Sequence, residues 1–203
     1  MIAIDDVMTA APVIPVLVLD GTLDPRALAE TLVEAGLPVL EVTLRTPQAL
    51  DALRAMADVS GAIVGAGTVL NADHLARAQD AGAQFIVAPG LTEPLTRAAL
   101  DSGVAYLPGV ATASDIMRGL DLGLSRFKFF PAESSGGLPA LKALAGPFGH
   151  VRFCPTGGIR PDAAREWLDH PAVPCVGGSW LVPTGANLAA IGSLAREAAN
   201  LRG

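Results

Sequence analysis

The sequence contains 203 residues, enough for one large domain or two small ones. Hydrophobic residues make up 51% of the chain, so a sizeable core can form without disulfides or bound metal. The formal net charge of -6 argues against nucleic acid or an acidic membrane surface as a partner.

The N-terminal region does not resemble an export signal or a membrane anchor. Asp5 and Asp6 stand where a signal peptide carries positive charge. The longest apolar run ends near Leu19, contains Pro12 and Pro15, and is too short to span a bilayer. We therefore expect a soluble cytoplasmic protein.

Cysteines and histidines form no metal-binding pattern. Cys154 and Cys175 have neither CxxC nor metal-ligand spacing, and His74, His150 and His170 form neither HExxH nor HxxxH. We expect no metal site and reduced, buried cysteines, whose roles the sequence leaves open.

Eight short apolar runs recur along the chain and start 20 to 26 residues apart. Such runs, bounded by turn residues, are typical of buried strands. They cover residues 13–19, 39–44, 63–68, 85–89, 105–108, 127–130, 151–155 and 174–178.

The stretches between these runs are rich in Ala and Leu and have helical periodicity with charged faces. Asp24 and Pro25 are an N-cap followed by proline at the first helical position. Other candidate starts are Asn71, Thr92, Thr112 and Asp162 or its neighbours, and candidate ends are Gly36, Gly82, Gly103 and Gly123. Residues 2–10 are a further short candidate helix.

Strands that alternate with helices predict right-handed βαβ units and a parallel sheet. Eight units in this length favour an α/β fold of one domain, residues 1–203: a compact eight-stranded (β/α)8 TIM barrel with a short N-terminal helix. The alternative is an open, doubly wound sheet. The even spacing and the absence of GxGxxG after the first run disfavour it.

A lysine lies within the sixth run. Because side chains alternate along a strand, Arg126, Lys128 and Phe130 share one face, and Phe127 and Phe129 share the other. Burial disfavours an ammonium, and a neutral amine attacks a ketone to form a Schiff base. The alternative is a lysine that extends from an edge strand into water.

The second run places charged side chains on one face. Glu41 and Arg45 alternate with apolar residues that should face the helices, so both are expected to point into the barrel. Glu41 and Lys128 then lie in one layer, as an acid/base group beside a nucleophile or as a structural ion pair. Arg45 is placed to bind a substrate carboxylate with two hydrogen bonds.

The third run ends in Gly65, Gly67 and Thr68. The glycines allow close approach to the backbone, and Thr68 adds a hydroxyl, although glycine here is also consistent with packing alone. The ends of the next two runs, at Pro89 and at Pro108, are interpreted as turns.

Paired glycines follow the last two runs. Gly157 and Gly158 come after the seventh, beside Thr156, and Gly177 and Gly178 end the eighth, beside Ser179. TIM barrels commonly bind phosphate at these two strand ends through backbone N–H groups. We predict a phosphate site, although a single Gly-Gly pair is also a common turn.

Together these segments resemble the 2-keto-3-deoxy-6-phosphogluconate (KDPG) aldolase family, also called 4-hydroxy-2-oxoglutarate (KHG) aldolase, of the Entner–Doudoroff pathway. The resemblance covers nearly the whole chain in the same order. Its segments are residues 12–16 (PVIPV), 40–46 (LEVTLRT), 64–70 (VGAGTVL), 89–94 (PGLTEP), 127–133 (FKFFPAE), 152–159 (RFCPTGGI) and 177–183 (GGSWLVP).

The resemblance implies a class I aldolase that uses no metal and no organic cofactor and forms a homotrimer. Lys128 is similar to the family's Schiff-base residue and Glu41 to its acid/base residue. The implied contacts of the pyruvyl group are Arg45, Thr68, Pro89 and Phe130, and those of the phosphate are Gly157, Gly158 and Ser179, with Thr156 and Gly178 nearby.

The expected reaction converts KDPG to pyruvate and glyceraldehyde 3-phosphate, and KHG to pyruvate and glyoxylate. One alternative is another enzyme on the same barrel: an aldolase for the galactonate-derived epimer, or a phosphosugar isomerase or epimerase. The other is a phosphosugar-binding protein without activity.

Overall fold

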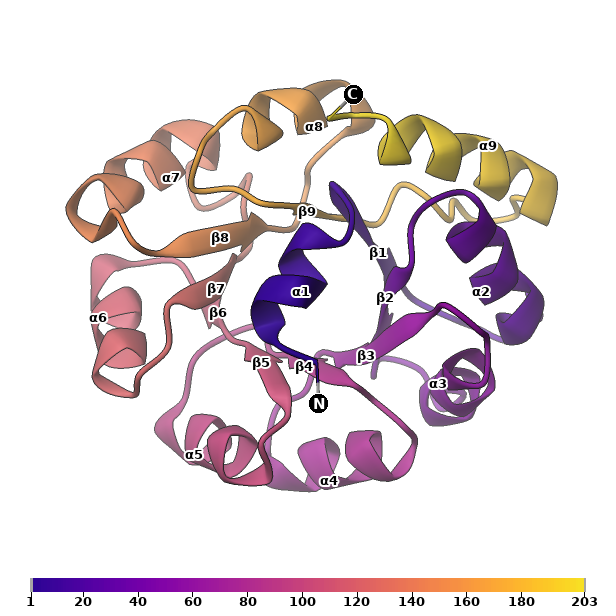
Figure 1. Ribbon diagram of the computed structural model, residues 1–203, viewed down its shortest axis with the longest axis horizontal. Coiled ribbons are helices and arrows are strands. Elements are labelled where there is room, and N and C mark those ends of the chain that lie inside the picture. The colour runs from indigo at the N-terminus through magenta and orange to yellow at the C-terminus, as the bar shows by residue number, and fades with distance from the viewer. Residues whose placement is uncertain (1, 203) are drawn as a thin grey trace.

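The computed structural model describes residues 2–202, in which strands and helices alternate (Figure 1). The strands are β1 (Val13–Leu17), β2 (Val39–Thr43), β3 (Ile63–Gly67), β4 (Phe85–Val87), β5 (Ala105–Leu107), β6 (Gly109–Val110), β7 (Arg126–Phe129), β8 (Arg152–Pro155) and β9 (Val176–Gly178). The α-helices are α1 (Ile4–Thr9), α2 (Pro25–Glu34), α3 (Ala49–Ala57), α4 (Ala72–Asp80), α5 (Glu93–Ser102), α6 (Ala113–Asp121), α7 (Gly137–Ala145), α8 (Pro161–Leu168) and α9 (Leu188–Ala199). A short 3-10 helix, Gly146–Phe148, follows α7.

The strands form a curled parallel sheet with the helices outside it. Six strands lie in the order β5-β4-β3-β2-β1-β9, and three lie in the order β6-β7-β8. Helices α2 to α9 surround these strands, and α1 lies across the middle of the view in Figure 1. The predicted α/β class, the parallel pairing and the N-terminal helix are confirmed.

The fifth apolar run does not end in a turn as predicted. Pairing continues beyond its last residue, Pro108, because Gly109 and Val110 form β6, which pairs with β7. A proline has no N–H to donate to a ladder, which explains the break between β5 and β6. The lysine-bearing sixth run is therefore β7 in this numbering.

Helix ends follow the chemistry of their sequences. The side chains of Asp24 and Asn71 accept hydrogen bonds from N–H groups in the first turns of α2 and α4. Thr112 and Asp115 form a capping box at the start of α6. Helix α8 begins at Pro161, so Asp162 lies in its first turn and does not precede it.

Two apolar clusters lie on opposite faces of the sheet. The larger packs the sheet against the outer helices and includes Phe127 and Phe129. The smaller gathers side chains of several strands with Val7 and Met8 of α1, and it contains both free cysteines, Cys154 and Cys175.

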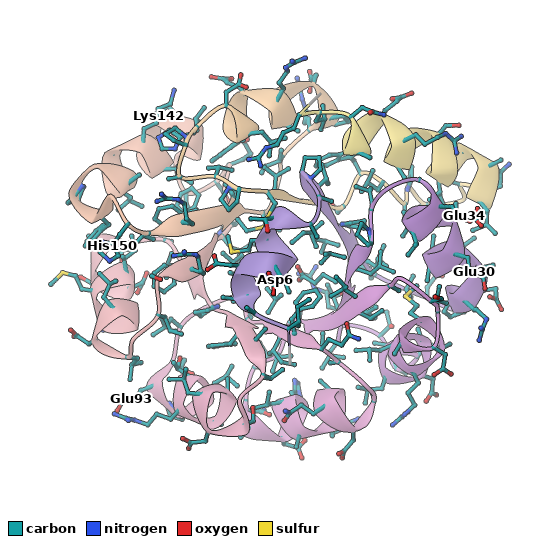
Figure 2. The ribbon with its side chains drawn as sticks, in the orientation of Figure 1. Asp6, Glu30, Glu34, Glu93, Lys142 and His150 are labelled. Atoms are coloured by element: carbon teal, nitrogen blue, oxygen red, sulfur yellow. The ribbon has the colours of Figure 1, made fainter. Side chains whose placement is uncertain are left out.

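Charged residues lie mainly outside these clusters. In Figure 2, Glu30, Glu34, Glu93 and Lys142 lie on the outer helices, at the periphery of the molecule. The site described next is therefore an exception, because its two central charges are buried.

Candidate active site

Lys128 is held in the interior by the strands on both sides of β7. Its parallel partners are Gly109 of β6 and Cys154 of β8, and its residue is 4% exposed. Phe127 and Phe129 point to the outer cluster, so the alternation predicted for this strand is confirmed.

Glu41 of β2 faces Lys128 across the interior. The Lys128 Nζ lies 3.2 Å from the Glu41 Oε1, and the two side chains are 5% and 4% exposed. Strand β2 pairs with β1 and β3, with Glu41 beside Val16 and Gly65. A buried amine and carboxylate in contact can exchange a proton without bulk water.

Gly67 makes room for the carboxylate. A Cβ atom at this position would overlap the Oε1 of Glu41 and would lie 2.7 Å from its Cγ. The absence of a side chain on β3 therefore lets Glu41 lie against the strand. The sequence suggested close approach to the backbone here, but it did not identify Glu41 as the group that approaches.

Phe130 and Arg126 lie on the same face of β7 as Lys128 and have different surroundings. The Lys128 Nζ lies 5.1 Å from the centre of the Phe130 ring, within the range of a cation–π contact. Arg126, at the other end of β7, forms an ion pair with Asp5 of α1. Its charge is thus compensated at the end of the strand covered by α1.

Arg45 and Thr68 are joined by a hydrogen bond. The Arg45 Nε donates to the Thr68 Oγ1 at 3.1 Å. Arg45 follows β2, which ends at Thr43, so it belongs to the loop and not to the strand as predicted. Thr68 has φ of 58°, a left-handed conformation that is strained for a β-branched residue.

A glycine loop, residues 156–158, lies beside the end of β9. Thr156 pairs with Gly177 in an isolated parallel bridge, and a Cβ at Gly177 would lie 2.8 Å from the Thr156 Cγ2. Gly157 and Gly158 have φ of 104° and 80°, which glycine adopts readily. The ring of Trp180 packs on Gly178, where a Cβ would lie 2.7 Å from it.

One pocket brings most of the predicted site residues together. Its lining is Val16, Arg45, Lys128, Phe130, Thr156, Gly157, Gly158, Ile159, Gly177 and Ser179. Glu41 and Thr68 are not among these residues, but Glu41 accepts a hydrogen bond from Lys128 and Thr68 accepts one from Arg45.

Pro89 and Gly178 are not among the lining residues. The Pro89 carbonyl lies against Gly109, the ladder partner of Lys128, where a Cβ would overlap it. Val16 and Ile159 were missed as lining residues, because an apolar side chain in a strand or loop carries no signal that separates lining from core.

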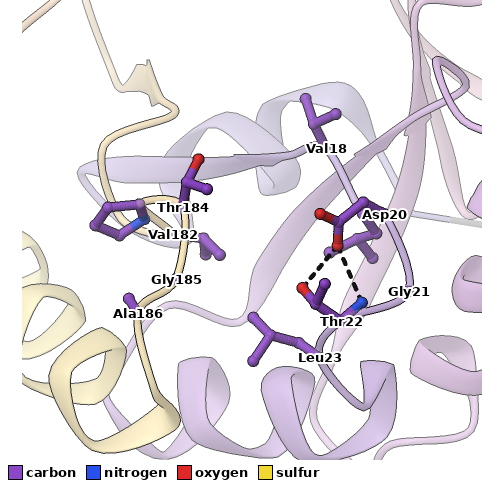
Figure 3. Close-up of a pocket in the computed structure, with 11 residues that line it drawn as sticks. Val18, Asp20, Gly21, Thr22, Leu23, Val182, Thr184, Gly185 and Ala186 are labelled. Atoms are coloured by element: carbon purple, nitrogen blue, oxygen red, sulfur yellow. Dashed lines mark hydrogen bonds between the residues drawn. The ribbon is translucent and has the colours of Figure 1, made fainter.

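A second pocket lies at the ends of β1 and β9, between the segments 18–23 and 182–186 (Figure 3). Asp20 accepts hydrogen bonds from the N–H and hydroxyl of Thr22, at 3.0 and 2.7 Å. These hydrogen bonds lower the pKa of Asp20. This pocket contains neither Lys128 nor Glu41.

Two further observations concern residues 2–202. These residues include no group of three or more His, Cys, Asp or Glu side chains that is arranged to hold a metal ion. No helix in the same range is both long and apolar enough to cross a membrane.

The fold and the pocket define an α/β protein whose site lies at the carboxyl ends of parallel strands. The family model described as KDPG and KHG aldolase matches residues 4–194. The chain belongs to this aldolase family, and the resemblance seen in the sequence is confirmed.

Relatives and solved structures agree with this assignment. The chain is 59% identical over 196 residues to the 2-dehydro-3-deoxy-phosphogluconate aldolase of Zymomonas mobilis, covering 96% of this chain and 94% of that protein. It is similar to a structure of the Zymomonas mobilis ZM4 aldolase with 3-phosphoglycerate, with TM-score 0.95, 58% identity and coverage of 98% and 95%. It is also similar to the Legionella pneumophila KDPG aldolase with pyruvate captured as a covalent carbinolamine, with TM-score 0.95, 43% identity and coverage of 98% and 99%.

Proposed function

We propose that this chain is a lyase that cleaves KDPG to pyruvate and glyceraldehyde 3-phosphate through a Schiff base on Lys128. The observation that carries the proposal is the buried contact of 3.2 Å between the Lys128 amine and the Glu41 carboxylate. The carbinolamine in the Legionella pneumophila structure supports it, because that species precedes a Schiff base. No metal or organic cofactor is needed, since the iminium itself accepts electrons.

The Lys128 amine attacks the C2 ketone of the substrate and forms a carbinolamine. Glu41 moves the protons that convert this carbinolamine to an iminium and release water. The resulting iminium withdraws electrons from C3. Glu41 then takes the proton of the C4 hydroxyl, the C3–C4 bond breaks, and glyceraldehyde 3-phosphate leaves. The remaining enamine is protonated at C3 and hydrolysed to pyruvate and free amine.

The remaining pocket residues bind the two ends of the substrate. Arg45, oriented by Thr68, pairs with the carboxylate of the pyruvyl group, while Phe130 excludes water near the amine. Pro89 acts from outside the lining, through its contact with Gly109, the ladder partner of Lys128. We place the phosphate against the glycine loop and Ser179, with Gly178 next to them, and expect backbone N–H groups there to donate to it. The 3-phosphoglycerate in the Zymomonas mobilis structure supports a phosphorylated substrate.

Trapping with borohydride tests the nucleophile. The sequence contains only two lysines, Lys128 in the pocket and Lys142 on α7. Incubation with pyruvate and borohydride should add one reduced pyruvyl group to Lys128, located by peptide mass mapping. The Lys142→Ala variant should be trapped like the original protein. Trapping of Lys128→Ala to the same extent would show that the nucleophile is another group.

Substitution of Glu41 tests its role as acid and base. Glu41→Gln should lower turnover by about 10²–10⁴-fold, the usual contribution of such a group. Near-normal turnover would refute the role.

Pyruvate release from KDPG, from its galactonate-derived epimer and from KHG ranks the three compounds as substrates. The family's name supports activity on KHG as well. An isomerase or epimerase would release no pyruvate.

We also propose that residues 1–203 form one domain, a closed eight-stranded barrel. Two features support closure: the bridge between Thr156 and Gly177 joins β8 to β9, and only Pro108 separates β5 from β6. A cytoplasmic homotrimer is supported by the family resemblance. Sedimentation equilibrium should then give three times the 20.7 kDa mass of the chain.

A further inference from the structure

Glu133 lies beside the glycine loop and has no part in the chemistry described above. It follows β7 by four residues, and its backbone N–H donates to the carbonyl of Gly157 at 3.1 Å. The preceding N–H, of Ala132, donates to the carbonyl of Thr156 at 2.8 Å. The segment after Lys128 therefore continues the pairing of β7 with β8 along the glycine loop.

The side chain of Glu133 packs on the same loop. A Cβ atom at Gly158 would lie 2.9 Å from the Glu133 Cβ and 3.0 Å from its Cγ. The stem of the glutamate thus fills the space beside Gly158, and the loop cannot move into that space without displacing it.

The carboxylate is anchored on its far side by α8. The Trp167 Nε1 donates to the Glu133 Oε1 at 3.2 Å. Trp167 is 2% exposed, and its ring lies 6.3 Å from the ring of Phe129, the residue after Lys128. A buried indole N–H needs an acceptor, and Glu133 supplies it.

We propose that Glu133 is a positioning residue: it holds the glycine loop in the shape that receives the phosphate, with its stem on Gly158 and its carboxylate fixed by Trp167. This inference rests on the phosphate site of the proposed function. Glu133 acts on the phosphate end of the substrate only, because its contacts are with the loop and α8 and not with Lys128 or Glu41.

A matched set of variants separates the effect of position from that of charge. Glu133→Ala removes stem and acceptor, whereas Glu133→Gln keeps an oxygen that accepts from Trp167 and removes the charge. The charge of Glu133 would act directly on a bound phosphate and on Arg160, whose pKa is raised chiefly by Asp162 and also by Glu133. Glu166→Ala, an exposed position next to Trp167, is the control for loss of a glutamate.

The experiment measures KM and kcat for KDPG and KHG, and competitive inhibition by inorganic phosphate. Glu133→Ala should raise KM for KDPG and weaken phosphate inhibition by about 5–10-fold, the effect of one ordinary lost hydrogen bond. Its kcat and its KM for KHG should stay within about twofold. Glu133→Gln and Glu166→Ala should behave like the original protein. Trp167→Phe keeps the Glu133 stem and removes only the donor, so it should raise KM for KDPG less than Glu133→Ala does.

Several results would overturn the inference. Equal loss on both substrates would indicate general destabilisation, and a Glu133→Gln variant as impaired as Glu133→Ala would indicate a charge effect. If the unsubstituted protein prefers KDPG and Glu133→Ala leaves both KM for KDPG and phosphate inhibition unchanged, only the positioning role is refuted. No preference of the unsubstituted protein for phosphorylated compounds would refute the phosphate site and this inference together.

Discussion

At the scale of single residues, Gly67 determines where the Glu41 carboxylate can lie. Gly67→Ala places a methyl group on the Oε1 of Glu41, so the carboxylate must move away from Lys128. We expect turnover to fall by about 10²-fold or more, approaching the loss of an acid/base group. Steady-state pyruvate release measures this loss.

The control for Gly67→Ala is Gly146→Ala. A Cβ at Gly146 meets nothing within 4 Å, and the residue has an ordinary φ of -52°. This variant should keep normal activity. Near-normal activity of Gly67→Ala would mean that the carboxylate reacts from another position.

Thr68 has a strained backbone conformation, and its side chain accepts a hydrogen bond from Arg45. Its left-handed conformation costs about 1–2 kcal/mol for a residue with a side chain, and glycine has no such cost. Thr68→Gly should therefore be no less stable in urea unfolding, but KM should rise because Arg45 loses its partner. Lower stability with unchanged KM would refute this account.

Residue chemistry was predictable where it depends on alternation along a strand. Lys128 and Glu41 were placed face to face because alternation points both side chains into the predicted barrel and alternate strands fill the same layer of its interior. The roles of Thr68 and Gly67 were harder to predict. The left-handed φ of Thr68 and the contact of Gly67 with Glu41 depend on the position of the neighbouring strand, which the sequence does not give.

At the scale of elements, β5 and α5 bury the single tyrosine of the chain. Tyr106 is 4% exposed, and its hydroxyl has no hydrogen-bond partner within residues 2–202. Burial raises the pKa of Tyr106 from 10.0 to about 12, and the nearby Thr96 hydroxyl offsets part of the rise. The phenol therefore stays neutral in the folded protein where an unfolded chain would ionise.

This difference predicts a loss of stability in alkali. Below pH 10 the phenol is neutral in the folded and the unfolded states, so its contribution to the free energy of unfolding does not change with pH. Between pH 10 and about 12 only the unfolded state releases the proton, so the free energy of unfolding falls by about 1.4 kcal/mol per pH unit.

Ultraviolet titration of tyrosinate measures the shift directly, since no other tyrosine contributes. Urea unfolding of Tyr106→Phe across the same range gives the matched comparison, because the variant lacks this part of the pH dependence. Native ionisation near pH 10 would contradict the burial argument.

Most elements were predictable from periodicity and caps, and the exception has a local cause. Within residues 2–202, the apolar runs predicted the strands except β6, and the Ala/Leu-rich stretches between them predicted α2 to α8. Pro108 was interpreted as the end of its strand, because proline commonly ends pairing. The structure resumes pairing one residue later, since β7 is still within reach of Gly109 and Val110.

At the scale of the whole molecule, the two ends of the sheet serve different purposes. Helix α1 covers one end with Val7 and Met8, whereas the opposite end carries the pocket with Lys128. Ligand bound at the pocket stabilises only the folded state, so occupancy should appear as stability of the entire chain.

Pyruvate at about one hundred times its dissociation constant for the unsubstituted protein should raise the free energy of unfolding of that protein by about 2.7 kcal/mol. The variants are measured at the same pyruvate concentration. The effect should be largely lost in Lys128→Ala, because the covalent imine cannot form, and retained in Lys142→Ala. Each protein is compared with its own pyruvate-free form, since Lys128→Ala also leaves Glu41 buried without its partner and lowers stability by itself. Chemical unfolding with and without pyruvate measures both quantities. Full stabilisation of Lys128→Ala would show that pyruvate binds this fold without forming the imine, and the lysine would then have to be assigned to structure alone.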